Sequence, residues 1–164
     1  MSLFLEAQEQ WGDFLENKIK NYEKFRNFDY GPTKESSVSK LSPYISHRVL
    51  YEYELISEVK KKYQSKNVNK FIEEVYWRIY WKGWMENRPG VWRDFISGKD
   101  YKYDNEIYKK AINGNSELGF FNSWVNELKT YNYLHNHTRM WFASTWIFNL
   151  GLPWQLGATF FFKH

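Results

Sequence analysis

A glutamate and an arginine, Glu74 and Arg78, lie four residues apart in a stretch that is rich in tryptophan. On an α-helix this spacing places both side chains on one face, where they can form an ion pair. Three tryptophans, Trp77, Trp81 and Trp84, lie on adjacent faces of the same segment. The pattern has two interpretations: an intrahelical ion pair beside a packed aromatic core, or two charges facing a tryptophan-walled pocket that suits a planar ligand. Because unpaired buried charge is costly, the second interpretation requires partners for both charges.

A second cluster of polar residues opens an otherwise apolar stretch, LHNHTRMWFASTWIF. His135 and His137 are two residues apart, so they diverge on a helix and make a poor pair of metal ligands. Asn136 and Arg139 are three apart and converge on one face. Together with Met140 they suit the wall of a pocket, but helix capping and solvation of a helix end explain them equally well.

The third cluster, SSVSKLSPY, places small hydroxyl residues directly before a predicted helix. Pro43 is well placed at a helix start, with Ser42 as the N-cap. Free backbone N–H groups and the helix dipole favour phosphate at such a point. Serine-rich loops that simply cap helices are common, so the motif alone permits both readings.

The elements that must position these residues are helices. Apolar residues recur near a period of 3.6, and no segment shows sustained alternation with a period of two. The sequence therefore predicts an all-α protein of about six helices, organised as a single domain over residues 1–164, with the principal helices sharing one core. Pro89-Gly90 is expected to stop the third helix, and 91–117 is expected to be short and irregular. The predicted helices are 3–26, 45–62, 67–87, 118–130, 135–150 and 154–164.

Composition narrows the class of protein further. Aromatic residues make up 21% of the 164 residues, which excludes wholesale disorder. The absence of cysteine excludes disulfides, thiolate metal sites and a cysteine nucleophile. The net charge of +4 is compatible with a polyanionic partner without indicating one. No signal peptide is visible, and we expect a cytoplasmic protein.

Residues 140–162 contain no charged side chain and are long enough to span a membrane. Gly151-Leu152-Pro153 interrupts this stretch where a helix should break, and polar residues are spread through it. Two consecutive buried helices explain the composition better, because helices that are apolar nearly all round belong in the core of a larger protein. We expect no membrane partner.

Taken in order, the three clusters resemble the motifs of DNA photolyases and cryptochromes. SKLSPY (39–44) resembles the family's TSxLSPYL phosphate loop, EVYWRIYW (74–81) resembles its ELxWREFY helix, and NHTRM (136–140) resembles its HNRxRM motif. Residues from Leu152 onward resemble the helix that follows. The resemblance covers roughly residues 22–164, with the motifs in family order and at compatible spacing.

The resemblance implies an all-α FAD-binding domain. The phosphate loop would surround the FAD diphosphate, mainly through backbone amides, and Tyr22 would match an upstream phosphate contact. Arg78 and Asn136 would contact the flavin, with Arg139 beside it. The implied cofactor-binding residues are thus Tyr22, Ser39, Leu41, Ser42, Arg78, Asn136 and Arg139.

The resemblance also implies light-driven electron transfer from reduced FAD to a pyrimidine dimer that is flipped out of damaged DNA. Glu74, Trp77 and Met140 would line the cavity for the dimer. Trp154 matches the middle member of the family's tryptophan electron-transfer chain. The place of the surface member falls near Tyr101, an aromatic residue able to carry a radical but not a tryptophan.

The sequence also departs from the family. Val38 stands where the family usually has Thr, and Asn122 stands where an Asp is usual. No part of the sequence resembles the family's DGDxASNxxxWxW segment or its α/β antenna domain. The resemblance therefore implies a natural or cloned fragment of a FAD-binding domain.

Two expectations follow from this interpretation. A chain lacking the DGD…ASN contacts should bind FAD weakly or not at all. Apolar surface that this segment would otherwise cover should drive self-association into a homo-oligomer. We expect that surface around Trp141, Trp146, Phe148 and Phe160 to Phe162.

Other functions remain open at this stage. The parent protein could be a light sensor of the cryptochrome type, or it could repair cyclobutane or (6–4) lesions. The chain itself could be a helical binding or scaffold protein that retains the fold and has lost the flavin. A membrane-associated helical protein is a third class.

Overall fold

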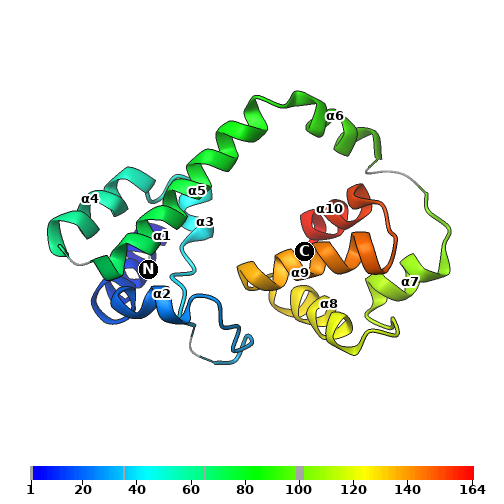
Figure 1. Ribbon diagram of the computed structural model, residues 1–164, viewed down its shortest axis with the longest axis horizontal. Helices are drawn as coiled ribbons and strands as arrows, with labels where there is room; N and C mark the ends of the chain where they lie inside the picture. Colours follow the sequence, from blue (N-terminus) through cyan, green and yellow to red (C-terminus); the bar gives the residue numbers. More distant parts are fainter. Residues whose placement is uncertain (1, 35, 65, 99–101) are drawn as a thin grey trace. The chain divides into compact units, whose positions relative to one another are not determined.

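The computed structural model describes residues 2–34, 36–64, 66–98 and 102–164. Its described residues form helices and loops, without a strand, which confirms the predicted all-α class (Figure 1). The helices are α1 (Leu3–Asp13), α2 (Tyr22–Phe25), α3 (Ser42–Ser46), α4 (Glu52–Lys62), α5 (Asn69–Glu86), α6 (Pro89–Gly98), α7 (Glu106–Asn113), α8 (Gly119–Tyr131), α9 (Asn136–Ser144) and α10 (Trp154–Lys163).

The chain divides into two compact units. Unit 1 comprises Met1–Tyr30 and Lys34–Asn87, and unit 2 comprises Gly31–Thr33 and Arg88–His164. The buried side chains of the described residues form one hydrophobic cluster in each unit, where the sequence predicted one shared core. The expectation of one core is therefore wrong, while the expected single domain over 1–164 stays a prediction.

In unit 1, the core forms where α1 and its continuation pack against α4 and α5. Trp11 and Phe14 are almost fully buried and contact the ring of Phe71 on α5 at centroid distances of 5.8 and 5.0 Å. The Trp11 indole N–H donates a 2.6 Å hydrogen bond to the Glu58 carboxylate on α4. A π-helical turn, Phe14–Lys18, and a 3₁₀ turn, Ile19–Asn21, carry the chain from α1 to α2, so the predicted helix 3–26 is correct in extent but irregular after Asp13.

In unit 2, aromatic side chains of three helices meet. Phe121 on α8 and Phe142 on α9 lie 4.6 Å apart, and Phe160 on α10 stacks on Phe142 at 6.0 Å. The indole N–H of Trp146 donates to the carbonyl of Pro153, which fixes the turn between α9 and α10. The break at residues 151–153 and the helix after it are thus confirmed.

The predicted helix 45–62 is wrong at its start. Helix α3 ends after one turn at Ser46, and Arg48, two residues further on, has a φ of +60° in the left-handed region. Val49 N–H donates to the Tyr44 carbonyl at 2.8 Å, and Arg48 N–H donates to the Ile45 carbonyl at 3.2 Å. This is the Schellman arrangement that closes a helix, with an arginine in the place that glycine usually takes. Helix α3 begins at Ser42, so Leu41 is the N-cap, not Ser42.

Residues 91–117 are more regular than expected, because α6 and α7 lie within them. Pro89 opens α6 and does not merely end α5, a position that suits a residue without an N–H. The Asn105 side chain caps α7 by accepting from the N–H groups of Ile107 and Tyr108. Gly114, with φ of +69°, ends that helix and confirms the predicted turn.

Within the described ranges, no helix is both long enough and apolar enough to cross a membrane.

Candidate functional site

The SKLSPY loop (39–44) is held at several points in unit 1. The Ser39 carbonyl accepts a 2.7 Å hydrogen bond from the side-chain amide of Gln10 on α1. The Leu41 side chain is 1% exposed and belongs to the unit 1 core. The Leu41 N–H donates to the Ser39 hydroxyl at 3.5 Å, and Lys40 between them has a left-handed φ of +53°. The loop therefore has a specific, non-extended backbone conformation.

Arg78 on α5 reaches the helix that follows this loop. One guanidinium nitrogen donates to the Ser46 hydroxyl at 2.6 Å, and another donates to the Ser42 hydroxyl at 3.5 Å. Its Nε lies 3.6 Å from the Glu52 carboxylate. This Nε is buried and has no hydrogen-bond partner among the described residues. The SKLSPY loop and the EVYWRIYW helix thus meet in unit 1, through a contact between Ser42 and Arg78, which are 36 residues apart in the sequence.

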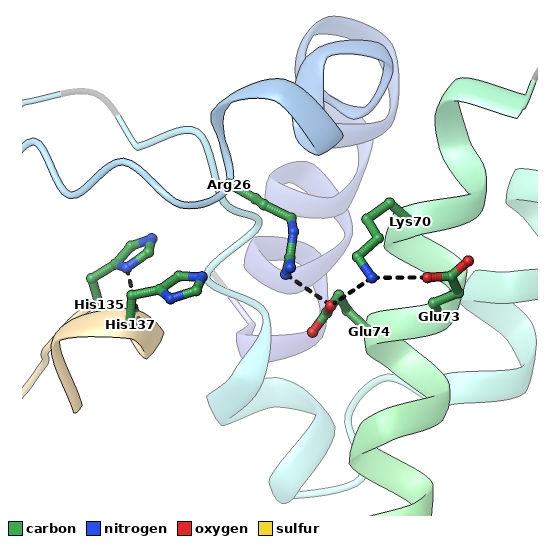
Figure 2. A network of polar contacts seen from close by, with 6 residues as sticks. All are labelled: Arg26, Lys70, Glu73, Glu74, His135 and His137. Atoms are coloured by element: carbon green, nitrogen blue, oxygen red, sulfur yellow. Dashed lines mark hydrogen bonds and ion pairs between the residues drawn. The ribbon is translucent and has the colours of Figure 1, made fainter. Parts of the chain in front are cut away.

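Glu74, one turn before Arg78, pairs with other cations and not with Arg78, the partner in the ion-pair interpretation. Its carboxylate contacts the Arg26 guanidinium at 2.8 Å and the Lys70 ammonium at 3.6 Å (Figure 2). Lys70 also pairs with Glu73 at 2.9 Å. The hydrogen bond to Glu73 is the main cause that raises the pKa of Lys70, assisted by the charges of both glutamates. Glu74 is thus compensated by cations of two elements, α5 itself and the end of α2.

The tryptophans of α5 are not a packed core. Trp77 and Trp81 are about half exposed, and their rings stack at a centroid distance of 6.4 Å. Tyr80 contacts both rings edge to face. The buried residues of α5 all lie in its first half: Phe71, Ile72 and Val75. The second half of the helix therefore presents an exposed aromatic surface within unit 1, so the packed-core interpretation is wrong for Trp77 and Trp81, while the pocket interpretation stays a prediction.

Tyr22, the weaker phosphate candidate, packs its ring edge to face against Phe14 and Phe71 at 5.8 and 5.5 Å. This packing gives the Tyr22 ring a structural role at the edge of the unit 1 core.

The NHTRM motif (136–140) opens α9 in unit 2. The His135 ring nitrogen Nδ1 accepts from the His137 N–H at 3.2 Å, so His135 is the residue that caps the helix (Figure 2). Arg139 turns back and donates from Nε to the Leu134 carbonyl at 2.9 Å, with its guanidinium over the Tyr133 ring. Asn136 and Met140 are exposed. The described residues include no cluster of three or more His, Asp or Glu that could hold a metal. The expectation that His135 and His137 diverge on a helix is wrong, because His135 is the N-cap and its ring stacks on the His137 ring at 5.8 Å.

The electron-transfer candidates belong to unit 2. Trp154, the first residue of α10, stacks on Phe95 of α6 at 6.4 Å and is 37% exposed. Tyr101 lies outside the described residues. Phe95 contacts Trp92 at 5.5 Å, and Trp92 is more than half exposed.

The apolar side chains that were expected to be exposed, around Trp141, Trp146, Phe148 and Phe160 to Phe162, are exposed only in part. Phe148 and Phe162 are more than four-fifths exposed, and Trp141 is about half exposed. Trp146 and Phe160 are buried in the unit 2 core, so the expectation is wrong for these two residues.

Asn122 makes a local network at the start of α8. Its side-chain oxygen accepts from the N–H and the hydroxyl of Ser116, and its amide nitrogen donates to the Ser116 carbonyl at 2.7 Å. The amide group both accepts and donates here, which a carboxylate could not do.

The sequence reasoning missed three residues near the candidate sites: Gln10, Arg26 and Glu52. Arg26 follows Tyr22 by four residues and could have been suspected from that spacing. Glu52 resembles any acidic residue in a first helical turn, and nothing around Gln10 distinguishes it from Gln8.

Comparisons with known proteins agree with the motifs. A deoxyribodipyrimidine photo-lyase of Vibrio cholerae is 23% identical over 167 residues, which cover 96% of this chain and 35% of the relative. The mitochondrial deoxyribodipyrimidine photo-lyase of Saccharomyces cerevisiae is 27% identical over 93% of this chain and 29% of the relative. A cryptochrome DASH of Danio rerio is 26% identical over 88% of this chain and 29% of the relative. No protein-family model matches the chain.

The fold has a counterpart among solved structures. The crystal structure of a bacterial class III photolyase from Agrobacterium tumefaciens matches with a TM-score of 0.77 and 22% identity, over 96% of this chain and 33% of that one. The chain thus spans about a third of the length of the relatives it matches. Together these similarities support a photolyase/cryptochrome-family helical domain, as the ordered motifs predicted. They lend no support to the expected homo-oligomer.

Proposed function

We propose that this chain contributes part of the FAD site of a photolyase- or cryptochrome-like flavoprotein, whose whole molecule acts on damaged DNA. The observation that carries the proposal is the contact between Arg78 and Ser42, because it joins two of the three motifs. The motif resemblance and the photolyase relatives support the choice of FAD as the cofactor.

The residues of unit 1 fit a diphosphate group. The buried Arg78 Nε lacks a hydrogen-bond partner among the described residues, next to a loop with a fixed backbone. A guanidinium is suited to phosphate because its N–H groups form a rigid fork. The resemblance implies a flavin contact for Arg78; because its guanidinium lies beside the loop, we instead assign Arg78 to the diphosphate, together with the backbone amides of Ser39, Leu41 and Ser42. In unit 2, Asn136 and Arg139 would be the flavin contacts, and both are exposed on α9.

Bound FAD would supply light-driven electron transfer. The chain's own contribution would be to bind the cofactor and the lesion. The half-exposed Trp77 ring offers a face on which a flipped base can stack. Glu74, held by Arg26 and Lys70, would be a fixed acceptor for a hydrogen bond from the lesion. The resemblance implies a contact with the lesion for Met140 and a role in electron transfer for Trp154.

We expect the 164-residue chain to bind FAD weakly, in the micromolar range or above. Fluorescence titration with FAD is the measurement, with Arg78→Ala as the test variant. Losing a charged hydrogen-bond donor costs about 1.5–3 kcal/mol, so the dissociation constant should rise about tenfold to a hundredfold.

Arg93→Ala is the matched control, because Arg93 is an exposed arginine on α6. It should leave the dissociation constant within about twofold, as expected for a surface change that removes no contact. Thermal melting of both variants checks that each is folded. Equal FAD affinity in the wild-type chain and the Arg78→Ala variant would contradict the proposal, and no binding by the folded wild-type chain would favour a scaffold role.

A further inference from the structure

Two side chains on one face of α1 hold the motif loop from both ends. Gln10 donates from its side-chain amide to the Ser39 carbonyl at 2.7 Å, just before the loop turns. Glu6, four residues earlier on the same face, accepts a 2.8 Å hydrogen bond from the Tyr44 hydroxyl just after it. The five residues from Ser39 to Pro43 therefore lie between two fixed points on α1.

Helix α1 is itself firmly anchored. Ala7 and Trp11, on the neighbouring face, are 0% and 2% exposed in the unit 1 core. The Trp11 indole also donates to Glu58 of α4 at 2.6 Å. A side chain on this helix therefore presents its polar group at a nearly constant place, which is what a positioning contact needs.

The loop needs such support. Lys40 has a left-handed φ of +53°, a conformation that costs a residue with a Cβ roughly 1 kcal/mol. Helix α3, which follows, has only five residues and cannot impose a loop conformation by itself. The hydrogen bonds from α1 are contacts that favour the observed backbone over more extended alternatives.

We propose that Gln10 is a positioning residue for the phosphate-binding loop, and that it raises the affinity for a diphosphate-bearing ligand without touching the ligand. This inference rests on the proposed function of the Ser39–Ser42 loop. Its physical basis is preorganisation: a loop already in its binding conformation loses less conformational entropy when the ligand binds. Glu6 supports the same segment from its other end.

The sharpest test replaces the donor by an acceptor of the same shape. In Gln10→Glu the carboxylate cannot donate, and an oxygen would face the Ser39 carbonyl oxygen at the former hydrogen-bond distance. Gln8→Glu is the matched control, because Gln8 is exposed on the same helix and the variant adds the same charge. Gln10→Ala removes the donor without adding charge, and it serves as the second variant if Gln10→Glu is unstable.

Two quantities are measured on the full chain. The first is hydrogen exchange of the backbone amides at residues 38–42 in the absence of ligand, with the amides of α4 as internal reference. The second is the dissociation constant for FAD and, separately, for inorganic pyrophosphate. We expect Gln10→Glu and Gln10→Ala to accelerate exchange in the loop about tenfold and to raise both dissociation constants about threefold to tenfold, relative to Gln8→Glu.

Hydrogen exchange tests whether Gln10 positions the loop, and the dissociation constants test whether the loop binds a diphosphate. Unchanged loop exchange in both Gln10 variants, with α4 unaffected, would overturn the positioning role. Faster exchange with unchanged affinity would overturn the link between loop conformation and binding. If the wild-type chain bound neither probe, the proposed function would fail and with it the effect on affinity, while exchange would still decide whether Gln10 fixes the loop.

Discussion

Glu52 is a charged side chain that is only 4% exposed, and it lies between two arginines. Its carboxylate contacts Arg48 at 3.2 Å and Arg78 at 3.6 Å. A buried carboxylate is tolerated only with such partners, because desolvation otherwise outweighs its attractions. The same carboxylate offsets part of the positive charge that Arg78 offers to an anion. This offset is a second reason, beside the one drawn from the sequence, to expect weak binding of FAD if Arg78 contacts the diphosphate as proposed.

Tyr44 gives a residue-scale prediction with a defined pH window. Its hydrogen bond to Glu6 is the main cause that raises its pKa above the ordinary value of 10.0. A raised pKa in the folded state means that the stabilisation is fully present below about pH 10 and is lost as the pH rises through the raised value. Tyr44→Phe should lower the free energy of unfolding by about 1 kcal/mol at pH 8.

The difference between wild-type chain and Tyr44→Phe should shrink towards zero above the raised pKa. Urea unfolding at pH 8 and at a series of increasing pH values above 10 measures it. Tyr53→Phe is the control, because Tyr53 is 68% exposed on α4. A Tyr44→Phe effect that stays the same size throughout this series would show that the hydroxyl stabilises through something other than this titration.

At the scale of elements, the sequence predicts helices well where an apolar period is long, and poorly where short helices are ended by hydrogen bonds. The period of the apolar residues predicted the first and last residues of α5 and α8 to within two positions. It failed at Arg48, because a Schellman turn closed by arginine carries no glycine signal. The periodicity also missed α6, because none of its residues is buried and because Pro89 was interpreted as the end of the preceding helix.

Helix α6 and helix α10 approach closely at Gly98, which allows an element-scale prediction. A Cβ added at Gly98 would lie 2.7 Å from Cγ and 2.9 Å from Cβ of Gln155. These atoms lie near the α10 backbone, so the helices must separate. Gly98→Ala should therefore lower the free energy of unfolding of unit 2 by about 1–3 kcal/mol.

Gly90→Ala is the matched control in the same helix. A Cβ there would meet no heavy atom of the described residues within 4 Å. Because alanine favours helix over glycine, this variant should be neutral or stabilising by up to about 1 kcal/mol. Denaturant unfolding of both variants gives the comparison, and an equal effect of the two substitutions would argue against the close helix contact.

At the scale of the whole molecule, the sequence identified the motif residues but not the partners that hold them. Ser42 and Arg78 could be associated through family resemblance, and the structure brings them into contact. Arg26, which compensates Glu74 from the end of α2, and the α1 side chains that hold the loop come from distant positions with no repeating pattern. Lys70, four residues before Glu74 on the same helix, is the one partner that local spacing could have indicated. Such contacts depend on the fold of unit 1 as a whole, and local periodicity does not contain that information.

The two hydrophobic clusters predict how the molecule unfolds. Val59 in the unit 1 cluster and Val125 in the unit 2 cluster are both 0% exposed. Replacing either by alanine should cost about 2 kcal/mol, through lost burial and the cavity left behind. For a unit of this size the melting temperature of the affected unit should fall by roughly 10 °C.

We expect differential scanning calorimetry of the wild-type chain to resolve two transitions, since each cluster is buried within its own unit. Val59→Ala should then lower only one of them and Val125→Ala only the other, which makes each variant the control of the other. The alternative is a single cooperative domain over 1–164. In that case both variants would shift one common transition by a similar amount, because loss of either cluster would unfold the whole chain. The assignment of each transition to its unit follows from which variant moves it.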